Sequence, residues 1–142
     1  MSIIELPALY IDDVVTIVSS ERPLLINRNP GPDEGNVPLD SKIELEIVDV
    51  GIAGINRSAT SVWVDDELAF EGNGAPEIKP AFNGVGAGVI QTSDTLRIVL
   101  APVVPFESQA VVQVRVVSAT MDGQSMDESY SFTVEDRTAP RR

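Results

Sequence analysis

The feature that most constrains this chain is an alternation of apolar and polar residues with a period of two. The stretch SKIELEIVDV places Ile43, Leu45 and Ile47 on one face of an extended chain and charged residues on the other. The same alternation recurs in TLRIVLAP, AVVQVRVVSA and ESYSFTVED. A helix needs apolar residues every three or four positions, and no convincing pattern of that kind follows residue 20. These runs therefore predict short β-strands, each with one apolar face.

Other segments complete the strand pattern. TSVWVDDELAF predicts a hairpin whose two strands are joined at Asp65 and Asp66. PLLINRNP predicts a first strand, and the stretch from Val85 to Gln91 predicts a weak strand interrupted by glycine. EGNGAPEIKPA carries too many Gly and Pro residues for regular structure. About seven short strands at this spacing predict an all-β fold, an antiparallel β-sandwich.

The length and the distribution of apolar residues divide the chain into three parts. A chain of 142 residues is long enough for one domain and a short arm. We expect the sandwich at residues 21–136, an N-terminal extended arm at 1–20 and a C-terminal tail at 137–142. The arm is rich in large apolar side chains, each worth about 1.5–3 kcal/mol when buried. We therefore expect a neighbouring subunit to cover it, through Ile3, Ile4, Leu6, Leu9, Tyr10, Ile11, Val14 and Val15.

The composition excludes several classes of function. With 22 acidic and 10 basic residues the net charge is −12, so phosphate backbones and anionic membranes repel the chain. We expect no nucleic-acid or membrane partner. The chain has no Cys and no His, which excludes disulfides, thiolate nucleophiles, Ser-His-Asp triads and His-ligated metals. We expect a protein that is not an enzyme and that holds no cofactor and no metal.

The first twenty residues also bear on localisation. They lack a basic start, and Glu5, Asp12 and Asp13 interrupt their apolar residues, unlike a signal peptide. No window approaches the roughly 18 apolar residues of a membrane helix. We expect synthesis in a cytoplasm without cleavage of a leader.

Two further contact sites are suggested by single residue types. Trp63 lies between two core-facing valines, so alternation turns it to the opposite face, where it would suit a subunit or a sugar. The alternative is that the register differs, or that a loop or the arm covers the ring. Arg137, Arg141 and Arg142 gather in the tail, where guanidinium groups would anchor an acidic partner; the alternative is a solvated tail.

Acidic residues cluster at the expected turns. Calcium takes six to eight oxygen ligands from such loops, but no DxDxDG loop is present, and turn acids usually bind their own backbone. We predict no metal site from them. The residues concerned are Asp65, Asp66, Asp122, Asp127, Glu128, Glu135 and Asp136.

Two long stretches resemble bacterial and phage Ig-like domains. VPLDSKIELEIVDVGIAGINRSATSVWVDDELAFEG is similar to that family's pattern of a Pro-rich loop, a strand ending in Asp, a loop with GI and a returning hairpin. PFESQAVVQVRVVSATMDGQSMDESYSFTVEDRTAP is similar to its final hairpin and linker. Matching positions in the second stretch are Pro105, Val112, Val114, Val116, Ala119, Asp122, Gly123, Tyr130, Phe132, Asp136, Thr138, Ala139 and Pro140. The family's usual Asn after the DG turn is replaced by QSM. The acidic residues also lack the regular spacing found in the calcium-bridged arrays of this family.

The resemblance covers about residues 22–140 and implies an Ig-like sandwich. It implies less about function, because such domains serve as spacers, adhesion modules and virion components. Together with the apolar arm, it leads us to expect a structural protein of a tailed-phage virion. Such a protein would decorate or reinforce the capsid, or belong to the tail, neck or fibre, and bind other virion proteins in a symmetric assembly.

Two alternatives stay open. One is a carbohydrate- or host-surface-binding adhesion module that uses Trp63 and the loop at 71–84, with a host-surface glycan as partner. The other is a unit of a secreted adhesin, which predicts calcium-dependent melting.

Overall fold

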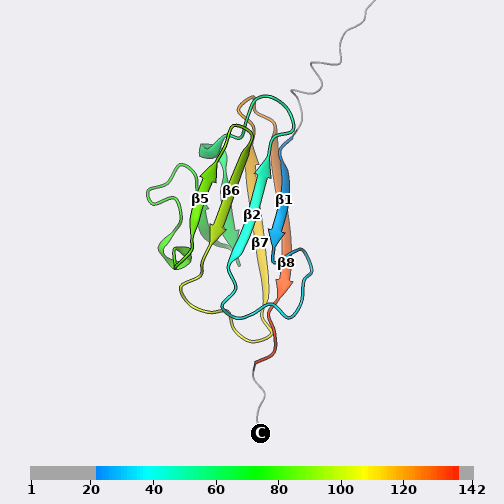
Figure 1. Ribbon diagram of the computed structural model, residues 1–142, viewed down its shortest axis with the longest axis vertical. Coiled ribbons are helices and arrows are strands. Elements are labelled where there is room, and N and C mark those ends of the chain that lie inside the picture. The colour runs from blue at the N-terminus through cyan, green and yellow to red at the C-terminus, as the bar shows by residue number, and fades with distance from the viewer. Residues whose placement is uncertain (1–21, 138–142) are drawn as a thin grey trace, which may run out of the picture.

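The computed structural model describes residues 22–137, which form eight β-strands and two short 3₁₀ helices (Figure 1). The strands are β1 (Leu24–Asn29), β2 (Ile43–Val48), β3 (Ser61–Val64), β4 (Glu67–Glu71), β5 (Gly88–Gln91), β6 (Thr95–Leu100), β7 (Val111–Ala119) and β8 (Ser125–Thr133). The helices are η1 (Arg57–Ala59) and η2 (Pro80–Phe82). The described chain enters at one end of the long axis and leaves at the opposite end (Figure 1).

The strands form two four-stranded sheets, in the orders β1-β2-β6-β5 and β4-β3-β7-β8. Within each sheet, every pair of neighbouring strands is antiparallel. The predicted all-β antiparallel sandwich is therefore confirmed. The described part has eight strands where about seven were expected, because the hairpin contributes two and the glycine-interrupted segment also forms β5.

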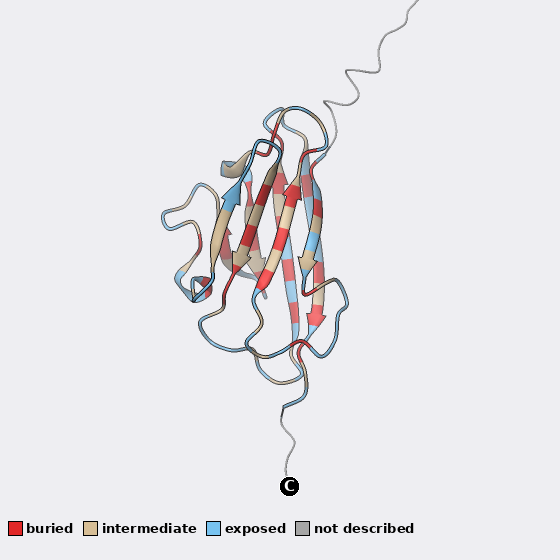
Figure 2. Ribbon diagram, viewed as in Figure 1, coloured by how far each residue is buried: buried red, intermediate tan, exposed pale blue. Residues whose placement is uncertain are grey.

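One core fills the space between the sheets. Ile43, Leu45 and Ile47 of β2 are fully buried, and their neighbours in sequence are not, as the alternating colours along the strands show (Figure 2). In β6 the same period buries Leu96 and Ile98, which pair in register with Ile47 and Leu45. Val112, Val114 and Val116 of β7 and Phe132 of β8 supply the facing layer. The alternation read from the sequence is thus the division between core and solvent.

The β3–β4 hairpin departs from simple alternation at one point. Asp65 and Asp66 both have positive φ, 50° and 66°, as the tightest hairpin turns require. Across the pair, Val62 opposes Phe70 but Trp63 opposes Leu68, so Ala69 is an extra residue, a β-bulge. Phe70 is buried, whereas Leu68 is only half-buried and lies opposite Trp63. The bulge therefore puts Leu68 and Phe70 on different faces of the sheet, although the alternation in the sequence placed both on the same face.

The long loops are held to the sheets by hydrogen bonds. In the irregular stretch after β4, the Glu71 amide donates to Glu77 and the Lys79 amide donates to Ala69, both at 2.9 Å, so residues 77–79 run along the free edge of β4. Arg57 in η1 binds both carboxylate oxygens of Glu77, at 2.7 and 2.5 Å. The segment is irregular, as the Gly and Pro residues predicted, yet it covers a sheet edge.

The loop before β2 covers part of a second edge. The Asp33 amide donates to Ser131 at 2.7 Å, and the Thr133 amide donates to Glu34 at 2.8 Å. Val37 then bridges in parallel to Val134. Residues 33–37 therefore pair with the C-terminal half of β8 and leave its N-terminal half, from Ser125 to Ser129, without a described partner on that side.

Candidate functional site

The outer face of the sheet β4-β3-β7-β8 carries the aromatic residue that the sequence singled out. Trp63 is half-buried between Val62 and Val64, both of which face the core. It lies on the side of the sheet away from the core, as the alternation predicted. β3 pairs with β7 so that Trp63 opposes Arg115.

Arg115 covers the indole ring. Its guanidinium carbon lies 5.1 Å from the ring centroid of Trp63, within the range of a cation–π contact. Asp127 on β8 holds the same guanidinium with two hydrogen bonds, from Nε at 3.0 Å and from Nη2 at 2.7 Å. These three side chains come from three adjacent strands and form a row across the sheet, which we call the Trp63 row.

The ion pair affects the acidity of both partners. Hydrogen bonds from Arg115 lower the pKa of Asp127 below its ordinary value, and the positive charge acts in the same direction. The same hydrogen bonds, with the carboxylate charge, raise the pKa of Arg115. Asp127 is therefore an anion throughout the neutral range, and the guanidinium is held over the ring.

Beside the row lies a shallow hollow of about 240 Å³. Hydrogen-bonding side chains line it next to the aromatic ring: Asp66, Gln113, Arg115 and Ser129. An aromatic ring bordered by polar groups suits a sugar, but the Arg115 guanidinium already occupies a face of this ring. A sugar stacking on that face would have to displace Arg115 from both Trp63 and Asp127.

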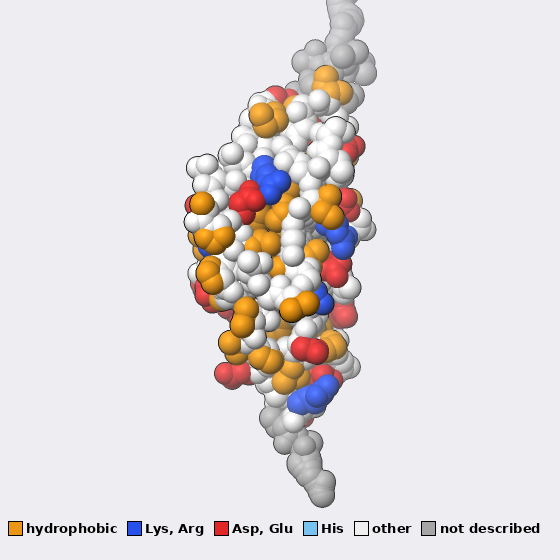
Figure 3. Space-filling view, turned by 60° about the vertical axis from the view of Figure 1, so that its left-hand side comes forward, with side chains coloured by type: hydrophobic (Ala, Val, Ile, Leu, Met, Phe, Trp, Pro, Cys, Tyr) orange, Lys and Arg blue, Asp and Glu red, His pale blue; other side chains and the backbone are white. Residues whose placement is uncertain are grey.

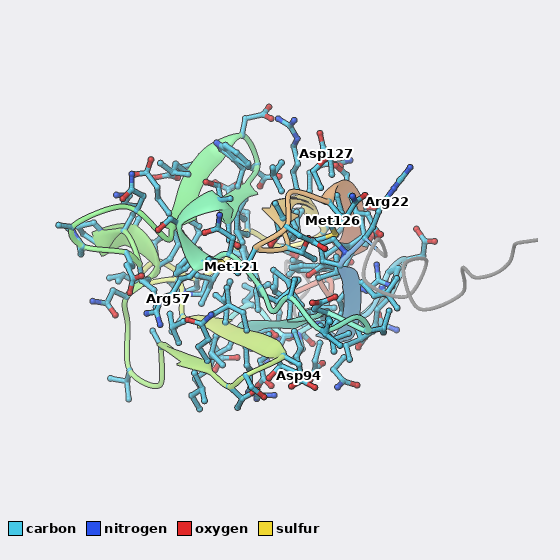
Figure 4. The ribbon with its side chains drawn as sticks, turned by 90° about the horizontal axis from the view of Figure 1, so that it is seen from above. Arg22, Arg57, Asp94, Met121, Met126 and Asp127 are labelled. Atoms are coloured by element: carbon cyan, nitrogen blue, oxygen red, sulfur yellow. The ribbon has the colours of Figure 1, made fainter. Side chains whose placement is uncertain are left out.

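A larger hollow, about 580 Å³, lies along the uncovered half of β8. It is lined by Arg22, Val117, Gly123, Gln124, Ser125, Met126 and Asp127. Figure 4 shows Arg22, Met126 and Asp127 together on one side of the sandwich, apart from Arg57 and Asp94. We call this the β8-edge groove. Arg22 is the first described residue, so the described chain begins at this groove.

A third hollow, about 270 Å³, is the most apolar of the three and lies where β3 and β4 meet the loop after β6. Its apolar lining includes Val64, Phe82, Val104 and Phe106. Val103 and Val104 beside it are 59% and 75% exposed. The view from the β5 side shows apolar side chains along the lower rim of the molecule, with acidic groups between them (Figure 3).

Several of the acidic residues at the turns have partners within the fold. Asp65 accepts the Gln113 amide at 2.9 Å, Asp122 accepts the Thr120 hydroxyl, and Asp127 binds Arg115. Within residues 22–137 no three His, Cys, Asp or Glu side chains are grouped so that they could hold a metal ion. These contacts fit the interpretation of the acids as turn and strand residues.

Most of the contact residues predicted from the sequence lie outside the described range. These are Ile3, Ile4, Leu6, Leu9, Tyr10, Ile11, Val14, Val15, Arg141 and Arg142. Of the tail arginines, Arg137 is described; its backbone amide donates to Ser108 and its side chain pairs with Glu135.

In the described residues no helix is both long and apolar enough to cross a membrane.

Sequence reasoning did not find Arg115 and Asp127 as partners of Trp63, nor the exposed valines at 103 and 104. The register between β3, β7 and β8 brings the first group together, and no local pattern encodes that register. Val103 and Val104 lie in a loop where hydrophobic periodicity carries no information.

Comparisons with known proteins give the fold class. No protein-family model matches the chain, and no curated protein matches it in sequence. Among solved structures, it is similar to CopC from Methylosinus trichosporium OB3b, with 14% identity and a TM-score of 0.50 over 84% of this chain and 99% of that one. It is also similar to dimeric latent PorU from Porphyromonas gingivalis, with 14% identity and a TM-score of 0.52, over 94% of this chain but 12% of that chain. The titin Ig tandem domains A164-A165 align with 13% identity and a TM-score of 0.45, over 83% of this chain and 51% of that one.

At such identities these likenesses concern the fold alone. The strand order in the two sheets, in which successive pairs of strands alternate between one sheet and the other, is that of an Ig-like sandwich. The chain is an Ig-like β-sandwich protein, as the resemblance implied.

Proposed function

We propose that the chain is a non-enzymatic structural protein of a tailed-phage virion, built on a bacterial or phage type of Ig-like domain. It decorates or reinforces the capsid, or forms part of the tail, neck or fibre. The observation that carries the proposal is that the described chain enters and leaves the sandwich at opposite ends of its long axis (Figure 1). The apolar arm and the arginine-bearing tail are then attached at opposite ends of one body, as in a component that bridges neighbours.

The roles of the motif residues support this proposal. Asp49 holds the loop that carries the GI motif, Gly123 takes a positive φ of 92° in the final hairpin, and Phe132 is fully buried. These residues maintain the sandwich. A function that uses the surface and the termini, by burial against other subunits, is compatible with all of them.

Deleting the arm tests the proposal. In particles purified from a lysate of the phage that encodes this chain, we expect mass spectrometry to detect the full-length protein. A variant lacking residues 2–20 should fold and stay soluble but be absent from the particles, because its contact area is lost. Truncated protein present at full occupancy would contradict the role of the arm, and absence of the full-length chain from particles would contradict the virion function.

A second function, a carbohydrate- or host-surface-binding module, is favoured by the polar hollow beside Trp63. Its test is a titration of Trp63 fluorescence with host glycans, since Trp63 is the only Trp in the chain. Saturable quenching that Arg115→Ala strengthens, by uncovering the ring, would support the module. No response from either protein would exclude sugar stacking on this face.

A further inference from the structure

Three sheet edges have no described strand or loop along at least part of their length. They are β1, β5 and the N-terminal half of β8. An open edge presents unpaired N–H and C=O groups and accepts an added strand unless its geometry prevents this. The three edges differ in how well they would do so.

Two of these edges are poor acceptors. β1 lies between Pro23 and Pro30, and its register shifts between Ile26 and Asn29, with Asn27 at a positive φ of 51°. β5 is four residues long and begins with Gly88. A short or irregular edge offers few hydrogen bonds in line.

β8 differs from both. It pairs with β7 through nine consecutive residues without a shift in register, so its backbone is regular. The pairing of its C-terminal half shows that the N–H and C=O groups of Ser131 and Thr133 point away from β7. By the two-residue repeat of a strand, the same groups of Ser125, Asp127 and Ser129 also point away from β7, and these three residues are exposed.

The β8-edge groove connects this edge to the arm. Arg22 lines the groove together with Ser125 and Asp127, so the arm joins the sandwich at the N-terminal end of the open edge. Twenty extended residues span up to roughly 65 Å, and the five-residue edge needs only about 17 Å of strand. The arm is therefore long enough to leave its own sandwich and pair with another.

We propose that the open half of β8, from Ser125 to Ser129, receives residues 14–18 of the arm of a second copy of this chain, as an added antiparallel strand. This inference rests on the proposed function, because it names the surface to which the arm attaches.

The sequence VVTIV sets the register. Glu128 projects from the core-facing side of the edge and is exposed, so the residue beside it has to be polar, and Thr16 is the one polar residue in the run.

With Thr16 opposite Glu128, the two apolar residues on the core side of the added strand fall beside apolar neighbours. Val14 then lies next to Tyr130 and Val18 next to Met126, both on the core side of β8. Val15 and Ile17 lie beside Ser129 and Asp127 on the outer side. The Asp127 carboxylate beside Ile17 is already paired with Arg115. A shift by one residue would instead put an apolar side chain against the carboxylate of Glu128, which forms no such ion pair with a described residue.

The arm of the same copy cannot easily take this place. β1 belongs to the other sheet, about 10 Å away from the sheet of β8. After pairing through Val18, the chain would have to reverse its direction and cross between sheets within residues 19–21. Exchange between copies removes this constraint, as in domain-swapped assemblies.

Two proline variants of the full-length chain test the edge. Ser129→Pro removes an outward N–H in the open half, while Ser131→Pro removes an outward N–H in the half already covered by residues 33–37, where no described group accepts it. Light scattering after size exclusion should show a multimer for the wild type and for Ser131→Pro. Ser129→Pro should weaken association at least about tenfold.

A disulfide test separates exchange from folding back. The chain has no Cys, and Thr16 and Glu128 would form a non-hydrogen-bonded pair whose Cα atoms are close enough for a disulfide. A mixture of Thr16→Cys and Glu128→Cys proteins, each carrying one Cys, should oxidise to a heterodimer on a non-reducing gel.

Three outcomes of these experiments would overturn the inference. A double variant that closes its disulfide within one chain would place the arm on its own β8. A multimer insensitive to Ser129→Pro, or a wild-type monomer, would show that the β8 edge does not receive a second copy's arm. Incorporation of the full-length chain into particles tests the proposed function separately. If the chain is incorporated although the β8 edge receives no arm, the arm attaches to a different protein.

Discussion

At the scale of single residues, the buried carboxylate of Asp49 has hydrogen-bond partners in its own loop. Asp49 is 3% exposed, and its carboxylate accepts the amides of Gly51 at 2.8 Å and of Gly54 at 2.6 Å. Gly54 has a φ of +88°, and its carbonyl accepts the Met121 amide, so Asp49 shapes the loop that contacts the final hairpin. Burying this carboxylate is tolerated because its oxygens are hydrogen-bonded.

Replacing Asp49 with Ala should lower the free energy of unfolding by about 1–3 kcal/mol, because two backbone N–H groups lose their acceptor in a buried loop. Urea denaturation followed by circular dichroism measures the change. Asp40→Ala is the matched control, since Asp40 is exposed, and it should change stability by less than about 0.5 kcal/mol. Equal effects of the two substitutions would contradict the role of Asp49.

Tyr130 is the opposite case, a buried polar group without a partner. Its hydroxyl has no hydrogen-bond partner, while the Arg28 guanidinium lies 5.2 Å from its ring centroid. Burial raises the pKa of Tyr130 well above the ordinary value of 10.0, against a smaller opposing effect of Arg28. The folded state therefore favours the protonated form.

The raised pKa of Tyr130 predicts a loss of stability at high pH. The stabilising contribution is complete below pH 10, the pKa of an unfolded tyrosine, and is lost as the pH rises from there toward the folded pKa. Tyr130→Phe should remove this alkaline loss and leave stability at pH 7 unchanged or higher by up to about 1 kcal/mol. Urea denaturation of both proteins at pH 7 and at an alkaline pH measures the free energy of unfolding. A large loss of stability in Tyr130→Phe at pH 7 would reveal a hydrogen bond to the Tyr130 hydroxyl.

At the scale of elements, backbones packed against each other limit which residues are allowed. Gly72 follows β4, and its amide donates to Thr60 at 2.9 Å. A Cβ atom at this position would lie 1.7 Å from the carbonyl oxygen of Arg57 in η1. The end of β4 can approach η1 this closely only because residue 72 has no side chain.

Gly72→Ala should therefore destabilise the protein by at least about 2 kcal/mol, since either η1 or the end of β4 has to move. Gly88→Ala is the matched control, because a Cβ at Gly88 in β5 has no heavy atom within 4 Å. It should be neutral or slightly stabilising. Thermal melting of both variants measures the difference, and a neutral Gly72→Ala would show that the contact is loose.

At the scale of the whole molecule, both sheets share one core, so the sandwich should unfold as a unit. Leu45 on β2 and Val114 on β7 are both fully buried within the same cluster. Leu45→Ala should cost about 2–5 kcal/mol, a large part of the roughly 5–15 kcal/mol expected of such a domain. Trp63, on the other sheet, should report the same loss.

The measurement is a comparison of two probes in urea. Trp63 fluorescence and far-ultraviolet circular dichroism should give coincident transitions in the wild type and in Leu45→Ala, with the midpoint shifted equally in both. Separate transitions would mean that the two sheets unfold independently and that the core is divided.

The sequence alone determined the fold class, the strand positions and the outward face of Trp63. Side-chain alternation with a period of two is a local property, so Ile43, Leu45 and Ile47 could be assigned to a buried face without knowledge of their partners. The Asp65-Asp66 turn was likewise encoded locally, since both residues tolerate a positive φ.

Only the tertiary structure decided which strands become neighbours. The bulge at Ala69, the pairing of Trp63 with Arg115 and Asp127, and the half-covered edge of β8 all depend on register between segments far apart in the chain. Register is set by the summed packing of both sheets and by loop geometry, and no single window of sequence contains that sum. The strands could therefore be read from the chain, whereas the surface they jointly form could not.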